Sequence, residues 1–336
     1  MVKIIKTAVF VIVAMVAIEA GSRFWFSDVP GRGCIVKDAK LGWKTRPGYT
    51  YKGFLSDNYG ISYEQNIKYD DNGFISFGSL KPKGKKKVLF IGDGVTQSIY
   101  MPNAYTYPRL LANSLAIEIF VYAVEGYGML QKYLVLEEWI KKIDPDIIVF
   151  QTRFTDIVYA DPMLEAECYS SGFIARTHAR PYLSEKGEIF YKNSYRGLFF
   201  LGLDLGSVAL SEIGNIIYRK LYLNRQKEQF AKIRKGEDKS YERARGNFET
   251  VLVKIKAIVP SGKKIYIIPS DEEDPFFKDI QAAAEKNGIT FVGIVPKAVR
   301  YEGEHGSYVW LRSSWDAKGQ NVVAQVLAGY LSKDIK

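Results

Sequence analysis

The chain carries Lys87-Val-Leu-Phe-Ile-Gly-Asp-Gly-Val-Thr-Gln97, a short apolar run that passes through two glycines into a helical pattern. Strands that are buried on both faces have such continuous apolar runs, and glycines mark the tight turn that follows. We therefore predict a buried strand over residues 88–91 and a strand-to-helix turn at Asp93 and Gly94.

Similar apolar runs recur along the chain, and helical patterns lie between them. The further predicted strands are 117–124, 147–151, 264–268 and 290–294. The predicted helices are 105–115, 130–143, 206–235, 241–258, 275–286 and 318–331. This alternation predicts an α/β fold: a three-layer, doubly wound, mostly parallel sheet with helices on both faces. Ligands of such sheets bind beyond the carboxyl ends of the strands.

Composition divides the chain into an N-terminal segment (1–26), a turn-rich lead-in (27–86) and an α/β domain (87–336). The lead-in ends in the basic linker 81–87, which we interpret as a solvated junction. Within the α/β domain, we expect residues 160–240 to be a largely helical insertion. No internal repeat of fixed period is present in the sequence.

The N-terminal segment resembles a membrane helix. Lys3 and Lys6 precede an uncharged, mostly apolar stretch (7–18), and three aromatic residues (24–26) follow it. Lysines inside and aromatic residues at the far interface are typical of a helix that enters a membrane from the cytoplasm. We therefore predict a single-pass anchor in the inner (cytoplasmic) membrane, with the soluble domain in the periplasm or outside.

Two alternatives to an anchor stay open. The uncharged run is shorter than the roughly 20 residues of a full span, so a removed signal peptide competes with it, as does a buried core helix. Ile18 and Met15 stand where cleavage after Ala20 or Ala17 would need a small residue. This favours the uncleaved anchor.

The composition is that of a folded protein, with 47% hydrophobic and 25% charged residues in 336. Lys and Arg outnumber Asp and Glu by 47 to 37, which gives a formal net charge of +10 and favours anionic surroundings such as headgroups or acidic glycans. The scattered basic residues match no nucleic-acid-binding signature, so we expect no nucleic-acid partner. Cys34 and Cys168 are the only cysteines, and we expect two isolated thiols or one optional disulfide. With so few soft ligands we expect no metal or other cofactor.

Four segments, in order, resemble the blocks of the SGNH/GDSL hydrolase family, in particular its membrane-anchored, envelope-directed branch. The resemblance covers residues 38–334, and the lead-in fits it through Leu41-Gly-Trp43, Pro47-Gly48 and Asn72-Gly-Phe74. The four blocks are Ile91-Gly-Asp-Gly-Val-Thr-Gln97, Ala123-Val-Glu-Gly-Tyr-Gly-Met-Leu-Gln131, the stretch 145–156 ending in Thr155-Asp156, and Arg312-Ser-Ser-Trp-Asp-Ala-Lys-Gly319. The resemblance implies a flavodoxin-like, SGNH hydrolase-type fold.

The catalytic residues of that family are replaced at each position. The family's serine attacks an acyl carbon, its histidine accepts the proton, an aspartate orients the histidine, and amide donors hold the oxyanion. The corresponding positions are Gly94 for the serine, Ser314 for the histidine, Arg312 for the aspartate and Thr155 for the asparagine donor. Of these functional positions, the resemblance preserves only Gly126, whose amide corresponds to a donor of the oxyanion hole. We therefore predict a pseudo-hydrolase with no catalytic residue.

A displaced catalytic pair is the alternative that would preserve activity. Ser98 lies four residues beyond Gly94, and His305 lies nine residues before Ser314. His178 is a second histidine, in the predicted insertion, with a structural role as its default. If Ser98 and His305 met within hydrogen-bond reach, the chain would be an active esterase or O-acyltransferase on envelope polysaccharide.

Without catalysis, the same pocket is predicted to bind a ligand. The amides of Gly94 and Gly126, with Thr155 and Arg312, would form a site for an acidic or acylated glycan. The competing expectation is a filled pocket in which Arg312 pairs with Asp316 or is solvated. We expect a binding or scaffold subunit of a cell-envelope or surface-polysaccharide assembly, with envelope proteins as partners.

Overall fold

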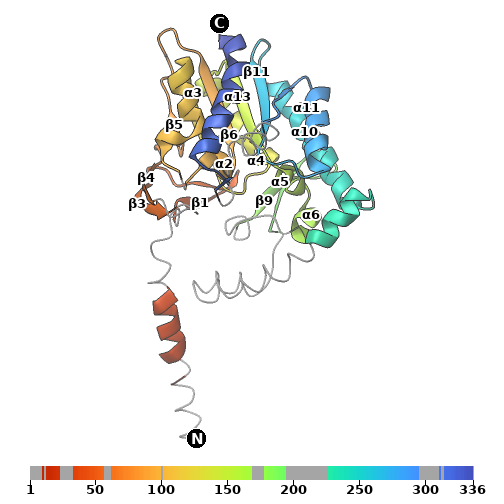
Figure 1. Ribbon diagram of the computed structural model, residues 1–336. Helices are drawn as coiled ribbons and strands as arrows, with labels where there is room; N and C mark the ends of the chain where they lie inside the picture. The colour runs from red at the N-terminus through yellow and green to blue at the C-terminus, as the bar shows by residue number, and fades with distance from the viewer. Residues whose placement is uncertain are drawn as a thin grey trace, which may run out of the picture.

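The computed structural model describes residue 10 and residues 13–22, 33–56, 62–99, 101–168, 178–193, 226–294, 310–311 and 314–335. Figure 1 shows an α/β body and, apart from it, the helix of residues 13–22. Among the described residues, no helix is both long and apolar enough to cross a membrane. Most of the predicted anchor (1–26) lies outside the described part.

The body is built on a six-stranded sheet in the order β12-β11-β8-β6-β7-β5. Its strands are β5 (Ser76–Phe77), β6 (Lys87–Gly92), β7 (Glu118–Ala123), β8 (Ile147–Thr152), β11 (Lys264–Pro269) and β12 (Thr290–Phe291). All neighbours are parallel except β5, which pairs antiparallel with β7 at one edge. After the edge strand β5, the chain forms β6 in the middle of the sheet, then adds β7 on one side and β8, β11 and β12 on the other. This is the predicted flavodoxin-like order, and its switch point lies between β6 and β8.

The central strands are buried on both faces because their side chains alternate between two apolar cores. Leu89 and Ile91 of β6 lie in one core, and Val88 and Phe90 lie in the other. The first core is covered by α4 (Met129–Ile143), α10 (Lys239–Ile258) and α11 (Phe276–Lys286). The second is covered by α3 (Tyr107–Leu115) and α13 (Ala317–Ile335). The predicted three-layer arrangement is therefore confirmed.

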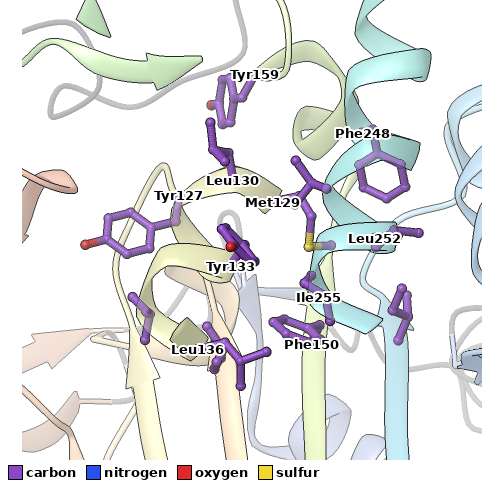
Figure 2. Close-up of a cluster of buried hydrophobic side chains, with 14 of the residues drawn as sticks. Tyr127, Met129, Leu130, Tyr133, Leu136, Phe150, Tyr159, Phe248, Leu252 and Ile255 are labelled. Atoms are coloured by element: carbon purple, nitrogen blue, oxygen red, sulfur yellow. The ribbon is translucent and has the colours of Figure 1, made fainter. Parts of the chain in front are cut away.

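The first core is densest between α4, α10 and β8. Figure 2 shows Met129, Tyr133 and Leu136 of α4 facing Leu252 and Ile255 of α10, with Phe150 of β8 beneath them. Burial of such side chains stabilises the fold by roughly 1.5–3 kcal/mol for each large apolar residue. This packing fixes the start of α4, and with it the loop that follows β7.

Short elements surround the sheet. The helical ones are α2 (Gly94–Gln97), η1 (Asn103–Tyr105), α5 (Phe154–Val158) and α6 (Pro162–Glu167). Four antiparallel hairpins are β1 (Ile35–Asp38) with β2 (Gly42–Thr45), β3 (Thr50–Ser56) with β4 (Ser62–Lys68), β9 (Arg180–Leu183) with β10 (Ile189–Lys192), and β13 (Trp310–Leu311) with β14 (Ser314–Trp315).

The lead-in is packed on the sheet. Its last strand, β5, belongs to the sheet, and Trp43 and Phe74 are buried in the first core. Gly42 has a φ of +80°, and a Cβ there would lie 2.2 Å from the Ala179 carbonyl oxygen. Only glycine allows β2 to approach β9 so closely. The hairpin β9–β10 from the predicted insertion is thereby held against the lead-in.

The predicted strands agree with the structure to within one or two residues, except that β12 ends at Phe291 and not at residue 294. Of the long predicted helix 206–235, residues 226–234 are described and helical, and the rest lies outside the described part. Cys34 and Cys168 are both buried free thiols. Burial, the largest cause, raises the pKa of Cys34 to about 11.

Candidate functional site

The turn after β6 is the predicted strand-to-helix turn. Asp93 caps α2, because its Oδ1 accepts a hydrogen bond from the Val95 amide at 2.8 Å. The Asp93 amide donates to Oε1 of Gln151, at the end of β8, at 2.9 Å. The turn is therefore fixed to both strands of the switch point, and Asp93 has a structural task in it.

Gly94 is the first residue of α2 and is partly exposed. Its φ is not positive, and a Cβ built on it would lie 3.4 Å from Cγ of Glu125. A Cβ could therefore stand here in ordinary contact with Glu125. Packing therefore does not require a glycine at position 94. Lack of space does not explain why a serine hydroxyl is absent there.

Ser98 lies beyond the last helical residue of α2 and so does not share a helical face with Gly94. The helix α2 ends at Gln97, and Ser98 is its C-cap with a φ of +47°. Its Oγ donates to the Val95 carbonyl at 2.5 Å and accepts from Nε2 of Gln320 at 2.9 Å. Ser98 is 2% exposed. Its hydroxyl is therefore engaged in closing the turn and in holding α13.

The second block forms the loop between β7 and α4. Gly126 has a φ of +79°, which glycine adopts without strain. The Gly126 carbonyl accepts from Nη1 of Arg180 at 2.8 Å, and the Glu125 carbonyl accepts from Nε1 of Trp43 at 3.1 Å. Trp43 of the lead-in and Arg180 of the predicted insertion therefore fix these two carbonyl groups. The amides of Gly94 and Gly126 donate no hydrogen bond within the described part of the chain.

Arg180 is the buried cation that supports this loop, and it was missed from the sequence. Its Nε lies 2.8 Å from Oε2 of Glu165, and its guanidinium lies 3.8 Å from the ring centre of Tyr159 and 4.8 Å from that of Trp43. An ion pair combined with aromatic stacking is how a buried guanidinium keeps its charge. Arg180 sits in a segment without a strong local pattern, so nothing in the sequence marked it.

The third block places Thr155 and Asp156 at the start of α5, directly after β8. Asp156 is fully buried and lies 2.7 Å from Nζ of Lys132, and its Oδ2 accepts from the Arg153 amide at 2.8 Å. Nζ of Lys132 also donates to the Gln151 carbonyl at 2.6 Å. Asp156 is therefore a structural acid. Thr155 is also buried, at 2% exposure.

A partly exposed ion pair lies at the same edge of the sheet and was not among the predicted residues. Nε of Arg153 lies 3.3 Å from Oδ2 of Asp271, whose Oδ1 accepts from the Phe154 amide at 3.0 Å. Burial, the largest cause, and the negative charge of Asp93 raise the pKa of Asp271 to about 6, although Arg153 opposes the shift. The signal in the sequence was the position of each residue, two or three places beyond a predicted strand.

The fourth block lies against the first, because β14 packs on α2. The side chain of Gln320 joins them: Oε1 accepts from the Tyr107 amide at 2.8 Å, and Nε2 donates to Ser98. Oδ1 of Asp316 accepts from the Gly319 amide at 2.8 Å and so caps α13. Arg312, His305 and the side chain of Ser314 lie outside the described residues. The ring centre of His178 lies 6.1 Å from that of Trp43.

The structure therefore brings three predicted residues, Gly94, Gly126 and Thr155, to the carboxyl edge of neighbouring strands, with the backbone of the Ser314 segment beside them. Among the described residues there is no cluster of three or more His, Cys, Asp or Glu that could hold a metal ion. Amide donors and one guanidinium can bind an anion, but they cannot attack a carbonyl carbon.

No family model and no curated protein matches the chain. Similar solved structures include a member of the lipolytic protein G-D-S-L family from Veillonella parvula DSM 2008, with 10% identity over 74% of this chain and 99% of that one and a TM-score of 0.41. TesA has 10% identity, the same coverages and a TM-score of 0.42. Axe2, an acetylxylan esterase from Geobacillus stearothermophilus, has 14% identity over 74% of this chain and 94% of its own, with a TM-score of 0.37.

The strand order of the described sheet is the doubly wound order expected from the sequence. Identities of 10–14% and TM-scores below 0.5 say nothing about the activity or the substrate of this chain, since one fold hosts many functions.

Proposed function

We propose that this protein is a catalytically inactive SGNH hydrolase-like protein, anchored in a membrane and facing outside the cytoplasm. In this proposal it serves as a binding or scaffold subunit of a cell-envelope or surface-polysaccharide assembly. The observation that carries the proposal is Gly94 at the first position of α2. The strand-to-helix turn that would present a nucleophile is formed, but the residue at the nucleophile position has no side chain. The supporting sequence feature is the replacement of the three partner residues at 155, 312 and 314.

Loss of the nucleophile and of the base would abolish the hydrolysis of esters. Removing members of a catalytic triad costs on the order of a million-fold in rate, and the remaining amide donors and binding leave only about 10³–10⁴-fold over the reaction in water. The hydrogen bonds of Ser98 also disfavour the alternative of an active esterase or O-acyltransferase. Its Oγ donates to a backbone carbonyl and accepts from an amide, and neither partner is a base.

The ligand we propose is an acidic or acylated glycan. The unengaged amides of Gly94 and Gly126 and the partly exposed guanidinium of Arg153 lie at one edge of the sheet and suit carboxylate or ester oxygens. Thr155 and Arg312 complete the predicted site. The helix dipole adds little, because α2 is a single turn of four residues.

Exposed apolar residues support the membrane part of the proposal. Helix 13–22 and the nearby Phe10 expose large apolar side chains: Phe10 is 73% exposed, Val16 63% and Val13 60%. A continuous apolar surface of this kind is unfavourable in water and is normally covered by a membrane or a partner. The aromatic residues 24–26, which follow in sequence, fit an interfacial position.

Calorimetric titration of the full chain with acidic oligosaccharides and their O-acetylated forms tests the binding role. We expect saturable heat that falls at least tenfold in affinity in R312A and in the double variant R153Q/D271N, which removes both charges of the pair together. R46Q removes an exposed arginine of the lead-in and serves as the matched control, with unchanged affinity. Absence of heat with every glycan, or equal affinity in all variants, would contradict the proposed ligand.

A further inference from the structure

A second concave site lies at the C-terminal end of α2. It is a cavity of about 240 Å³ between strand β4, the segment that leads into β5, the end of α2 and η1. Gly94, Gly126 and Thr155 do not line it, whereas Gln97 and Ser98 at the end of α2 do. At about 30 Å³ per water, the cavity has room for a small organic molecule of modest length.

One polar side chain in the wall of this cavity has no partner. Gln65 of β4 is 1% exposed, and its Nε2 makes no hydrogen bond. A buried amide donor that is left unsatisfied destabilises the folded protein, and such groups are rare in native structures. A ligand oxygen at this position would satisfy it. The neighbouring polar wall residue, Gln97, is already engaged, with Tyr69 and with the Glu125 amide.

The rest of the wall is mostly apolar, with one cation at its rim. Ile67, Phe77 and Met101 are buried or half-buried and offer hydrocarbon surface. Lys68, the next residue along β4 from Ile67, is exposed and makes no ion pair in the described part of the chain. Because side chains alternate along a strand, β4 presents Gln65 and Ile67 inward and Lys68 outward at the edge. Small-molecule sites typically combine an apolar wall with a few such polar groups.

We propose that this cavity binds a short acyl group, with the acyl oxygen accepting a hydrogen bond from Nε2 of Gln65 and the hydrocarbon chain lying on Ile67, Phe77 and Met101. A free carboxylate would gain the charge of Lys68 in addition, whereas an ester would not. This site is separate from the one at Gly94 and does not depend on the absence of catalysis there.

Hexanoate, methyl hexanoate and hexylamine distinguish the possible ligands, because the protonated amine has no acceptor for Gln65. Each is titrated into the full chain held in lipid nanodiscs, with empty nanodiscs as the blank. We expect hexanoate and methyl hexanoate to bind and hexylamine to bind at least tenfold more weakly. K68A should weaken hexanoate alone, and K52A, which removes an exposed lysine from the paired strand β3, should weaken neither.

Gln65→Leu is the decisive variant. It should weaken hexanoate and methyl hexanoate at least tenfold and raise the melting temperature of the ligand-free protein, because it removes an unsatisfied buried donor. M101W fills the same space without touching Gln65 and should block both ligands. No binding to the parent chain, equal binding of hexylamine, or unchanged affinity in Gln65→Leu or M101W would overturn the proposal. Loss of glycan binding at the sheet edge would leave these results unaffected.

Discussion

Gly94 lacks a side chain at a position where a side chain would fit. A Cβ there would lie 3.4 Å from Cγ of Glu125 and 3.7 Å from its Cα and Cβ, and the backbone is not in the left-handed region. We therefore expect Gly94→Ser to fold normally, with a free energy of unfolding within about 1 kcal/mol of the parent chain. Urea denaturation measures this.

The same variant should not hydrolyse esters. In the sequence resemblance the base position is Ser314, which cannot accept a proton near neutral pH. The expected rate of Gly94→Ser with an activated acetyl ester equals that of Gly94→Ala, its matched control. A rate in Gly94→Ser a hundredfold above that control would show that a histidine reaches the turn.

Asp271 gives the fold a pH dependence. Its pKa is raised to about 6 in the folded state, mainly by burial, from the ordinary value of 3.8, so the folded protein holds this proton more tightly than the unfolded chain. The contribution of Asp271 to the free energy of unfolding is therefore largest below about pH 4. It decreases as the pH rises to about 6 and stays constant at higher pH. The side chain is 22% exposed, and the full effect is at most about 3 kcal/mol.

Asp271→Asn should remove that part of the pH dependence and keep the acceptor for the Phe154 amide. Denaturation midpoints of the parent and the variant, measured from pH 4.5 to pH 7.5, should diverge as the pH rises. Parallel curves over this range would mean that Asp271 titrates near its ordinary value.

At the level of elements, α13 is attached to the first block through one side chain. Gln320 accepts from the buried Tyr107 amide of α3 and donates to Ser98 at the end of α2. Gln320→Leu leaves the Tyr107 amide unsatisfied, and we expect a loss of about 1–3 kcal/mol in the free energy of unfolding. Q325L replaces an exposed glutamine on the same helix and should change it by less than about 0.5 kcal/mol. Equal losses in the two variants would show that the attachment is not energetically important.

The hairpin β9–β10 has a comparable role for the second block. Arg180 of β9 holds the Gly126 carbonyl and is itself held by Glu165 of α6. The loop that carries Gly126 is therefore positioned by the segment that the sequence suggested was only inserted material. These long-range contacts fix the conformation of the loop.

For the molecule as a whole, the proposed membrane attachment assigns the anchoring role to the exposed apolar helix 13–22. We expect V13D/V16D to move the full chain from the membrane to the soluble fraction after alkaline extraction, because charges are costly in the hydrocarbon region. V253D introduces one such charge at an exposed valine of α10 and should leave the distribution unchanged. Retention of V13D/V16D in the membrane would mean that another surface anchors the chain.

The architecture could be predicted because its signals are local. Each central strand is a short apolar run between turn residues, so β6, β8 and β11 were found to within one or two residues. The hydrogen bonds and ion pairs that support the site could not be predicted, because they join residues far apart in sequence. Lys132 and Asp156 are 24 residues apart, Arg180 and Gly126 are 54 apart, and Arg153 and Asp271 are 118 apart. Ser98, the displaced candidate nucleophile, is the C-cap of the four-residue helix α2, whose end no local pattern marked.

The absence of ester chemistry is the central claim, and one measurement tests it directly. The purified full chain is incubated with an activated acetyl ester and with a fluorescent serine-reactive phosphonate, beside its S98A and Gly94→Ala variants. We predict no covalent label and the same background rate in all three proteins. Labelling or turnover in the parent chain that S98A abolishes would contradict the account and make the protein an esterase with a displaced nucleophile.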